Sequence, residues 1–289
     1  MEPQMITGMP RIAIAAHDFE AMVHCFDRAF GMPIVQLPES VVRHLGARLA
    51  MCVPSGGSNI ELMCPANPSL PLSQSLSSFL ERRGEGLFAL MLEADDPDSA
   101  AELFAARGLD VLPLMPGAGG RDIHPRSTHG VLIRIYPTGS FTRSATESAT
   151  ESADAPAHTS GLSGIQRVLI AVEDLEAASA VYVEGLGLTA GSEHLNIRYG
   201  TRSIEVLPPG EQGIIELVTP VELDKPLARL VDQQLSAKGS GLFGLVVTAP
   251  DLSPALTTLV EAGIGCSEVA PGAALVEIFG TRIILEQEF

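Results

Sequence analysis

Arg11-Ile-Ala-Ile-Ala-Ala-His-Asp-Phe-Glu-Ala21 reappears further along the chain as Arg167-Val-Leu-Ile-Ala-Val-Glu-Asp-Leu-Glu-Ala177. Two shorter stretches repeat at nearly the same spacing, Ile60-Glu-Leu62 as Ile215-Glu-Leu217 and Gly86-Leu-Phe88 as Gly241-Leu-Phe243. Three matches in the same order at one period indicate a duplicated domain. Equivalent positions can therefore be compared within one molecule.

The size and composition are those of a two-domain globular protein. With 289 residues and 46% apolar side chains, the chain can fill two hydrophobic cores and is not disordered. Its net charge of −17 leaves no basic stripe to neutralise phosphates, so we expect no nucleic-acid partner. The sequence shows neither a signal peptide nor an apolar run of membrane length. We therefore expect a cytoplasmic protein without a membrane partner, either a monomer or a homodimer.

The four cysteines follow no CxxC spacing and are expected to be free thiols, mostly buried. They are Cys25, Cys52, Cys64 and Cys266.

Residues 141–160, which repeat the tetrapeptide Ala-Thr-Glu-Ser, lack apolar periodicity and are typical of a linker. They divide the chain into a first domain, 1–140, and a second, 161–289. In each domain an Asp that can cap a helix is twice followed by a Gly that can end it. This pattern predicts helices over 18–31, 96–108, 174–187 and 251–263. Short apolar or alternating runs flank these helices, so each domain is predicted to be α+β, with two modules of a strand, a helix and further strands.

Three segments carry a likeness to a known family: Arg11–Ala21, Gly84-Glu-Gly-Leu-Phe-Ala-Leu-Met-Leu-Glu-Ala-Asp-Asp96 and His124-Pro-Arg-Ser-Thr-His-Gly-Val-Leu-Ile133. With them the chain resembles the vicinal oxygen chelate superfamily of glyoxalases, bleomycin-resistance proteins and extradiol dioxygenases. The first half is most similar to methylmalonyl-CoA epimerases. The resemblance implies a tandem of two glyoxalase-like domains, each made of two βαβββ modules that form a curved half-barrel sheet around a cup.

The resemblance also implies a divalent metal in each cup, held by a His, a Glu or Gln, a second His and a Glu. The matching positions are Arg11, Glu61, Ala89 and Arg134 in the first domain, and Arg167, Glu216, Gly244 and Ile284 in the second. A guanidinium has no lone pair to give, and the aliphatic residues have no donor atom. One carboxylate per cup remains, so we expect neither cup to bind the family metal, and we expect no cofactor.

Two interpretations of the first cup remain open. Arg11, Glu61 and Arg134 could form a salt-bridge cluster that fills the space of the metal. Alternatively, one guanidinium is left over and binds an anionic or acyl oxygen as the metal would. Two positive charges against one negative favour an anionic ligand. In the second cup, Arg167 and Glu216 are a balanced pair that fits either a structural role or contact with a substrate.

Three histidines and a serine complete the candidate site. His44 is expected on the strand that leads into the first cup, where it could act as a general base on a carbon acid. The resemblance places His124, Ser127 and His129 in a loop near the substrate. The structural alternatives are a solvent-facing strand position for His44 and a loop-capping role for the others.

Three functions are compatible with these residues. The first is an isomerase, epimerase or lyase that acts on a small anionic or acyl-CoA-like substrate. In it, Arg11 or Arg134 would stabilise an enolate, and His44 or Glu61 would be the base. The second is a non-catalytic protein that binds or sequesters a small molecule, as bleomycin-resistance proteins do. The third is an interaction scaffold.

Overall fold

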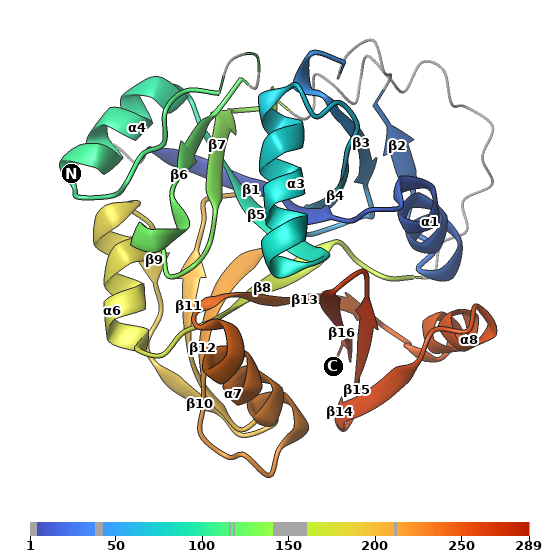
Figure 1. The fold of residues 1–289 in the computed structure, drawn as a ribbon. Coiled ribbons are helices and arrows are strands. Elements are labelled where there is room, and N and C mark those ends of the chain that lie inside the picture. The colour runs from blue at the N-terminus through green and yellow to red at the C-terminus, as the bar shows by residue number, and fades with distance from the viewer. Residues whose placement is uncertain are drawn as a thin grey trace.

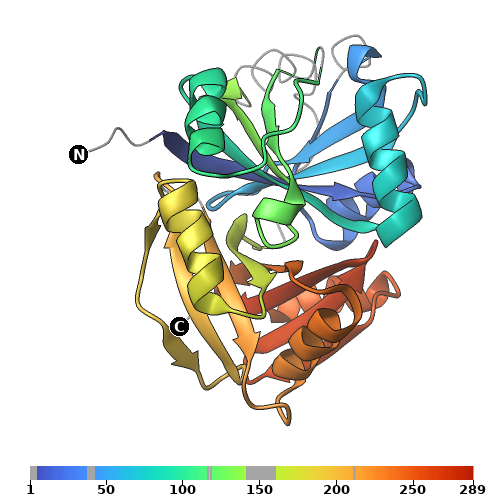
Figure 2. The same ribbon diagram turned by 60° about the vertical axis from the view of Figure 1, so that its left-hand side comes forward.

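The chain folds into two similar sheets, one above the other, each with its own helices (Figures 1 and 2). This computed structural model describes residues 5–37, 43–115, 117, 119–140, 161–210 and 213–288. The segment expected to be a linker, 141–160, lies outside the described residues. A sheet of seven strands comes from the first half and a sheet of nine strands from the second. The predicted α+β tandem is confirmed.

The first sheet has the order β2-β3-β4-β1-β5-β7-β6, with β1 and β5 antiparallel at its centre. Ala13 lies beside Glu61 of one neighbouring strand and Ala89 of the other. Because alternate residues of a strand share a face, Arg11, Ala13, Glu61 and Ala89 lie on one face, the first cup face. The strands are β1 (Ile6–Ala15), β2 (Ile34–Gln36), β3 (Ala47–Cys52), β4 (Asn59–Pro65), β5 (Gly86–Ala94), β6 (Arg121–Ile123) and β7 (Ile133–Pro137).

The second sheet repeats this arrangement, in the order β10-β11-β12-β8-β13-β16-β15-β14, with β9 paired to β11. Leu169 lies beside Glu216 and Gly244, as Ala13 lies beside Glu61 and Ala89. The predicted equivalence of the two halves therefore holds in the strand register. The strands are β8 (Ile165–Ala171), β9 (Thr189–Ala190), β10 (His194–Asn196), β11 (Thr201–Leu207), β12 (Ile214–Pro220), β13 (Gly241–Ala249), β14 (Cys266–Ala270), β15 (Ala273–Ile278) and β16 (Thr281–Gln287).

Four helices follow the predicted aspartates and pack on the sheet faces opposite the cups. They are α1 (Phe19–His24), α4 (Pro97–Ala106), α6 (Leu175–Ala180) and α8 (Ser253–Glu261). Asp18, Asp96 and Asp174 cap the first three through their carboxylates. α1 and α6 each continue into a π-helical turn, η1 (Cys25–Ala29) and η4 (Val181–Gly185). Short 3-10 turns, η2 (Arg43–Leu45) and η3 (Pro125–Ser127), complete the first domain.

Two further helices, which the Asp and Gly pattern did not predict, cover the cup faces. α3 (Pro71–Arg83) and α7 (Pro226–Lys238) each lie in front of their own sheet in Figure 1. Leu72, Leu76 and Leu80 of α3 pack against the alanines and methionines of the first cup face. Leu227 and Val231 of α7 do the same in the second domain. Each cup is therefore closed by a helix with an apolar face.

The two domains are joined by backbone contacts and one shared core. Ser58 pairs with Ile165 as an isolated antiparallel bridge, with N···O distances of 2.9 and 2.8 Å. Arg107, just after α4, donates to the carbonyl of Gly185 in η4 at 3.3 Å. The largest buried cluster runs through both domains, from Ile12 and Phe26 to Ile170 and Tyr182. The halves are packed as one body, with α4 beside α6 and α1 beside α8 (Figures 1 and 2).

One module has fewer strands than the other three. The second module of the first domain has three strands among the described residues, and its missing strand is reduced to the bridge Val111↔Ile123. Pro113 follows this bridge closely, and proline has no N–H to donate to a ladder, so the pairing does not extend.

The cysteines are free, and three of the four are buried, as predicted. Burial raises the pKa of the Cys25 thiol to about 11. None of the helices in the described residues combines the length and hydropathy that a membrane-crossing helix needs.

Candidate functional site

The first cup contains a buried ion pair where the resemblance implied a metal. Nε of Arg11 donates to Glu61 at 3.0 Å, and both side chains are about 95% buried (6% and 5% exposed). Burial by itself would lower the pKa of Arg11, but Glu61 and the ring of Tyr136 outweigh it, and the pKa is raised. Arg11 is therefore charged and faces a carboxylate.

Arg134 has a carboxylate of its own, which sequence reasoning missed. Asp122 of β6 lies directly opposite Arg134 in the ladder, and the two side chains approach to 3.4 Å. Tyr136 lies between the two arginines, with its ring centroid 4.4 Å from Arg11 and 5.1 Å from Arg134. The first cup thus holds two guanidinium groups and two carboxylates, so the excess positive charge expected from three residues is offset.

Burial raises the pKa of Asp122, and the positive charges of Arg134 and Arg121 offset only part of this rise. The same balance raises the pKa of Tyr136, where burial opposes the two arginines. Both shifts express the cost of keeping these groups away from water.

These residues do not fit the divalent metal that the resemblance implied. Ala89 offers no donor, and the two guanidinium groups bring positive charge to the place where the cation would lie. Within the described residues, no group of three or more His, Cys, Asp or Glu side chains is placed to hold a metal ion.

The second cup is a larger network than the predicted pair. Arg167 lies 3.0 Å from Glu216, as expected, and donates to Glu286 at 2.6 Å. Glu286 also accepts from the hydroxyl of Tyr199 and lies 4.0 Å from Arg198. Gly244 and Ile284 supply no polar atom here. Two arginines and two carboxylates again balance. Glu286 lies two residues after Ile284 on the same strand face, and the family pattern did not indicate it.

The other candidates lie apart from these clusters. The predicted strand position of His44 is wrong, because the residue is exposed in the turn η2 before β3. Its Nε2 bonds the carbonyl of Gly117 at 3.0 Å rather than a cup residue. Nδ1 of His124 accepts from the backbone N–H of Arg126. The hydroxyl of Ser127 donates to the carbonyl of His124 in the same turn and accepts from the backbone N–H of Asp110, which lies outside the turn. His129 has a positive φ of 50° after this turn. The hydrogen bonds of His124 and Ser127 are those of the loop-capping alternative.

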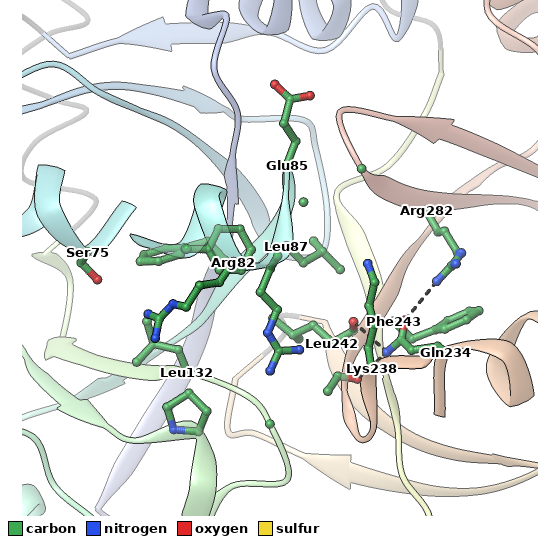
Figure 3. Close-up of a pocket in the computed structure, with 18 of the residues that line it drawn as sticks. Ser75, Arg82, Glu85, Leu87, Leu132, Gln234, Lys238, Leu242, Phe243 and Arg282 are labelled. Carbon is green, nitrogen blue, oxygen red and sulfur yellow. Dashed lines mark hydrogen bonds between the residues drawn. The ribbon is translucent and has the colours of Figure 1, made fainter. Parts of the chain in front are cut away.

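A pocket of about 640 Å³ lies between the domains, where α3 and α7 end (Figure 3). Its apolar lining includes equivalent positions of the two halves, Leu87 and Phe88 with Leu242 and Phe243. Arg82, Arg83, Lys238 and Arg282 bring basic groups to it, and Glu85 and Glu277 bring acidic ones. Of the predicted site residues, only His124 lines this pocket.

The pocket charges differ in their partners. Arg282 pairs with Glu277 at 2.9 Å and donates to the side chain of Gln234 at 3.0 Å. Glu85 accepts from the backbone of His17 at 2.8 Å. Arg82 donates to a carbonyl of its own helix, at Ser78. Within the described part of the chain, no carboxylate is paired with Arg82, Arg83 or Lys238, so the pocket has excess positive charge.

One repeated feature of the sequence indicates this pocket, a basic residue before the glycine that ends a helix. Arg83-Gly84 and Lys238-Gly239 end helices of equal length and lie 155 residues apart (238 − 83). A basic residue followed by a capping glycine is therefore part of the repeat.

Comparison with known proteins supports the resemblance. Residues 11–124 match the family model of the Glyoxalase/Bleomycin resistance protein/Dioxygenase superfamily. No protein of curated function matches the chain at a significant level.

Two solved structures share the fold over nearly the whole chain. A mutant of 4-hydroxymandelate synthase from Streptomyces coelicolor covers 99% of this chain and 95% of its own, with a TM-score of 0.64 and 13% identity. A xylose isomerase-like TIM barrel/4-hydroxyphenylpyruvate dioxygenase fusion protein covers 99% of this chain and 50% of its own, with a TM-score of 0.60 and 15% identity. Methylmalonyl-CoA epimerase of Streptomyces coelicolor covers 46% of this chain and 99% of its own at 25% identity, with a TM-score of 0.37. The first domain therefore matches the model of this superfamily over residues 11–124, and the chain shares the fold of the first two structures over nearly its whole length.

Proposed function

We propose that this protein binds a small anionic organic molecule in the pocket between its domains, without the family metal and without catalysis in the cups. The observation that carries the proposal is the charge of the pocket. Four of the 18 Lys and Arg residues line it, against two of the 35 Asp and Glu residues. An acidic protein that gathers its few basic groups around one cavity is suited to an anionic ligand.

The lining supports an organic anion rather than an inorganic ion. A volume of about 640 Å³ is typical of pockets that enclose a small organic molecule. Phe88 and Phe243 form part of the wall together with the leucines before them. Arg282 lies 4.7 Å from the ring centroid of Phe243, so a cationic and an apolar surface adjoin. Such a wall can bury a hydrocarbon part while the basic groups hold a carboxylate or phosphate.

The alternative is an isomerase, epimerase or lyase in the first cup, in which Arg11 or Arg134 stabilises an enolate. It requires one of these guanidinium groups to face a substrate oxygen, whereas Glu61 and Asp122 already face them. The leucines of α3 also cover this cup. Turnover of an acyl-CoA that persists in the presence of a chelator and is lost in Arg11→Met would favour the enzyme.

Binding of octanoate, benzoate or acetyl-CoA tests the proposal. We expect at least one of these probes to raise Tm by several degrees at about 100 times its Kd, because a ligand that binds only the folded state adds about 2.7 kcal/mol. Arg83→Gln or Lys238→Gln should weaken that binding about tenfold, the loss of one charge-assisted hydrogen bond. Thermal shift and calorimetric titration measure both effects.

The control is Arg28→Gln, which removes an exposed arginine outside the pocket lining. It should leave the Kd of the probe unchanged. Absence of any response to the three probes, or equal weakening by Arg28→Gln, would contradict binding in this pocket.

Metal removal should have no effect on the folded protein. Each cup offers guanidinium and aliphatic groups in place of the expected nitrogen and oxygen donors, so a divalent ion has no set of ligands to stabilise it. We expect elemental analysis of the purified protein to find no stoichiometric Zn, Fe, Mn, Co or Ni. Dialysis against EDTA should leave Tm within about 1 °C of its starting value. One equivalent of metal per chain would contradict this expectation.

A further inference from the structure

Resting on the proposed function, we infer that the pocket ligand carries two anionic groups joined by an apolar segment, and that each domain holds one of them. The repeat brings one basic residue from each domain to the pocket, at equivalent positions. Arg83 is the last residue of α3 and Lys238 the last residue of α7. Each is followed by a glycine with positive φ, Gly84 at 76° and Gly239 at 73°. The two helices therefore end in the same way and bring the two charges to one cavity.

Apolar side chains lie among the basic groups of the pocket. In Figure 3, Arg82 lies on one side of the pocket, Lys238 and Arg282 lie on the other, and Leu87 and Leu242 lie between them. These leucines are themselves an equivalent pair of the repeat, as are Phe88 and Phe243, which also line the pocket. A ligand with a single charged end would leave the basic residue of one domain without an anionic partner. A ligand charged at both ends matches each part of the lining.

Helix ends explain part of this arrangement. Arg and Lys in a last helical turn are favoured by the partial negative charge of the C-terminus, and this accounts for Arg83 and Lys238 one at a time. It does not account for Arg282, which comes from a strand, or for the meeting of both helix ends at one pocket. Among the described residues, the only carboxylates that line the pocket are Glu277, which pairs with Arg282, and Glu85, which bonds the backbone of His17. Neither neutralises Arg83 or Lys238.

A series of dicarboxylates tests the inference. Succinate, adipate, suberate and sebacate are titrated at low ionic strength, each beside the monocarboxylate with the same number of carbons. We expect one diacid to bind at least about tenfold more tightly than its monoacid. Arg83→Gln and Lys238→Gln should each bring the Kd of that diacid close to the Kd of the monoacid, and Arg28→Gln should not change it.

The outcomes separate the inference from the proposed function. If the monoacids bind and depend on Arg83 or Lys238, but no diacid binds more tightly, the pocket takes a singly charged ligand and the inference is wrong while the proposed function stands. If a diacid gains affinity that only one of the two variants removes, both anionic groups contact one domain, and the inference is again wrong. If none of these acids and none of the other probes binds, both fail.

Discussion

Gly280→Ala is expected to lower the free energy of unfolding by about 4 kcal/mol, because the added methyl group meets backbone of the other domain. A Cβ at this position would lie 1.9 Å from the carbonyl oxygen of Glu85 and 2.5 Å from its carbonyl carbon. A backbone oxygen cannot turn away as a side chain can, so the two domains must separate locally. The φ of 61° adds about 1 kcal/mol, since alanine is strained in the left-handed region. Urea denaturation followed by circular dichroism measures the loss.

Gly263→Ala is the matched control. Gly263 also has a left-handed φ, 76°, but no atom lies within 4 Å of its added Cβ. It should therefore cost only about 1 kcal/mol, the conformational part of the effect. Gly130 provides a second test through the equivalent contact, because its Cβ would lie 2.0 Å from the carbonyl oxygen of Ser240. Losses for Gly280→Ala and Gly130→Ala no larger than that of the control would mean that the domains do not meet through these glycines.

The fold could be predicted from local sequence patterns because each pattern occurs in both domains. Asp18 and Asp174 cap equivalent helices, and Glu61 and Glu216 lie at equivalent places in the two sheets. The sequence left two interpretations of the first cup open, and the pairing of Arg11 with Glu61 was one of them. Both residues could be assigned to one cup because the family pattern places their strands side by side. α3 and α7 were missed because a serine-rich segment and a run of mixed polarity do not present the Asp and Gly pattern that marks the other helices.

The rest depends on strand register and on packing between domains. Asp122 lies opposite Arg134 only because β6 and β7 pair in one particular register, and a slip of one residue would put it on the other face. Glu286 was missed for a related reason, since the family pattern selected Ile284 two residues earlier on the same strand. The pocket joins residues from both halves, and no pattern within one half indicates where the halves touch. In the sequence, the positive charge of this pocket is indicated only by Arg83 and Lys238, which occupy equivalent positions of the repeat.

Glu61→Leu should lower the free energy of unfolding by about 3 to 5 kcal/mol, because it removes the carboxylate that lies 3.0 Å from the guanidinium of Arg11 in the protein interior. Arg11→Met should cost a similar amount, because it leaves a carboxylate in the same apolar surroundings. The surface pair Arg202–Glu193 is the control, with side chains 54% and 46% exposed at a distance of 3.2 Å. Glu193→Leu should cost less than about 1 kcal/mol. Chemical denaturation of the variants measures all three values.

The double variant Arg11→Met with Glu61→Leu decides what the buried pair is for. If it fills the place of a metal and does nothing else, replacing both charges with apolar groups of similar size should bring stability back to within about 1 kcal/mol of the original chain. Binding of octanoate should also be retained, because the pocket between the domains is not built from these residues. A double variant that loses the sum of the two single effects would show that other groups of the cup need both charges. A stable double variant that no longer binds any anion would instead place the ligand in the cup and overturn the assignment of the pocket.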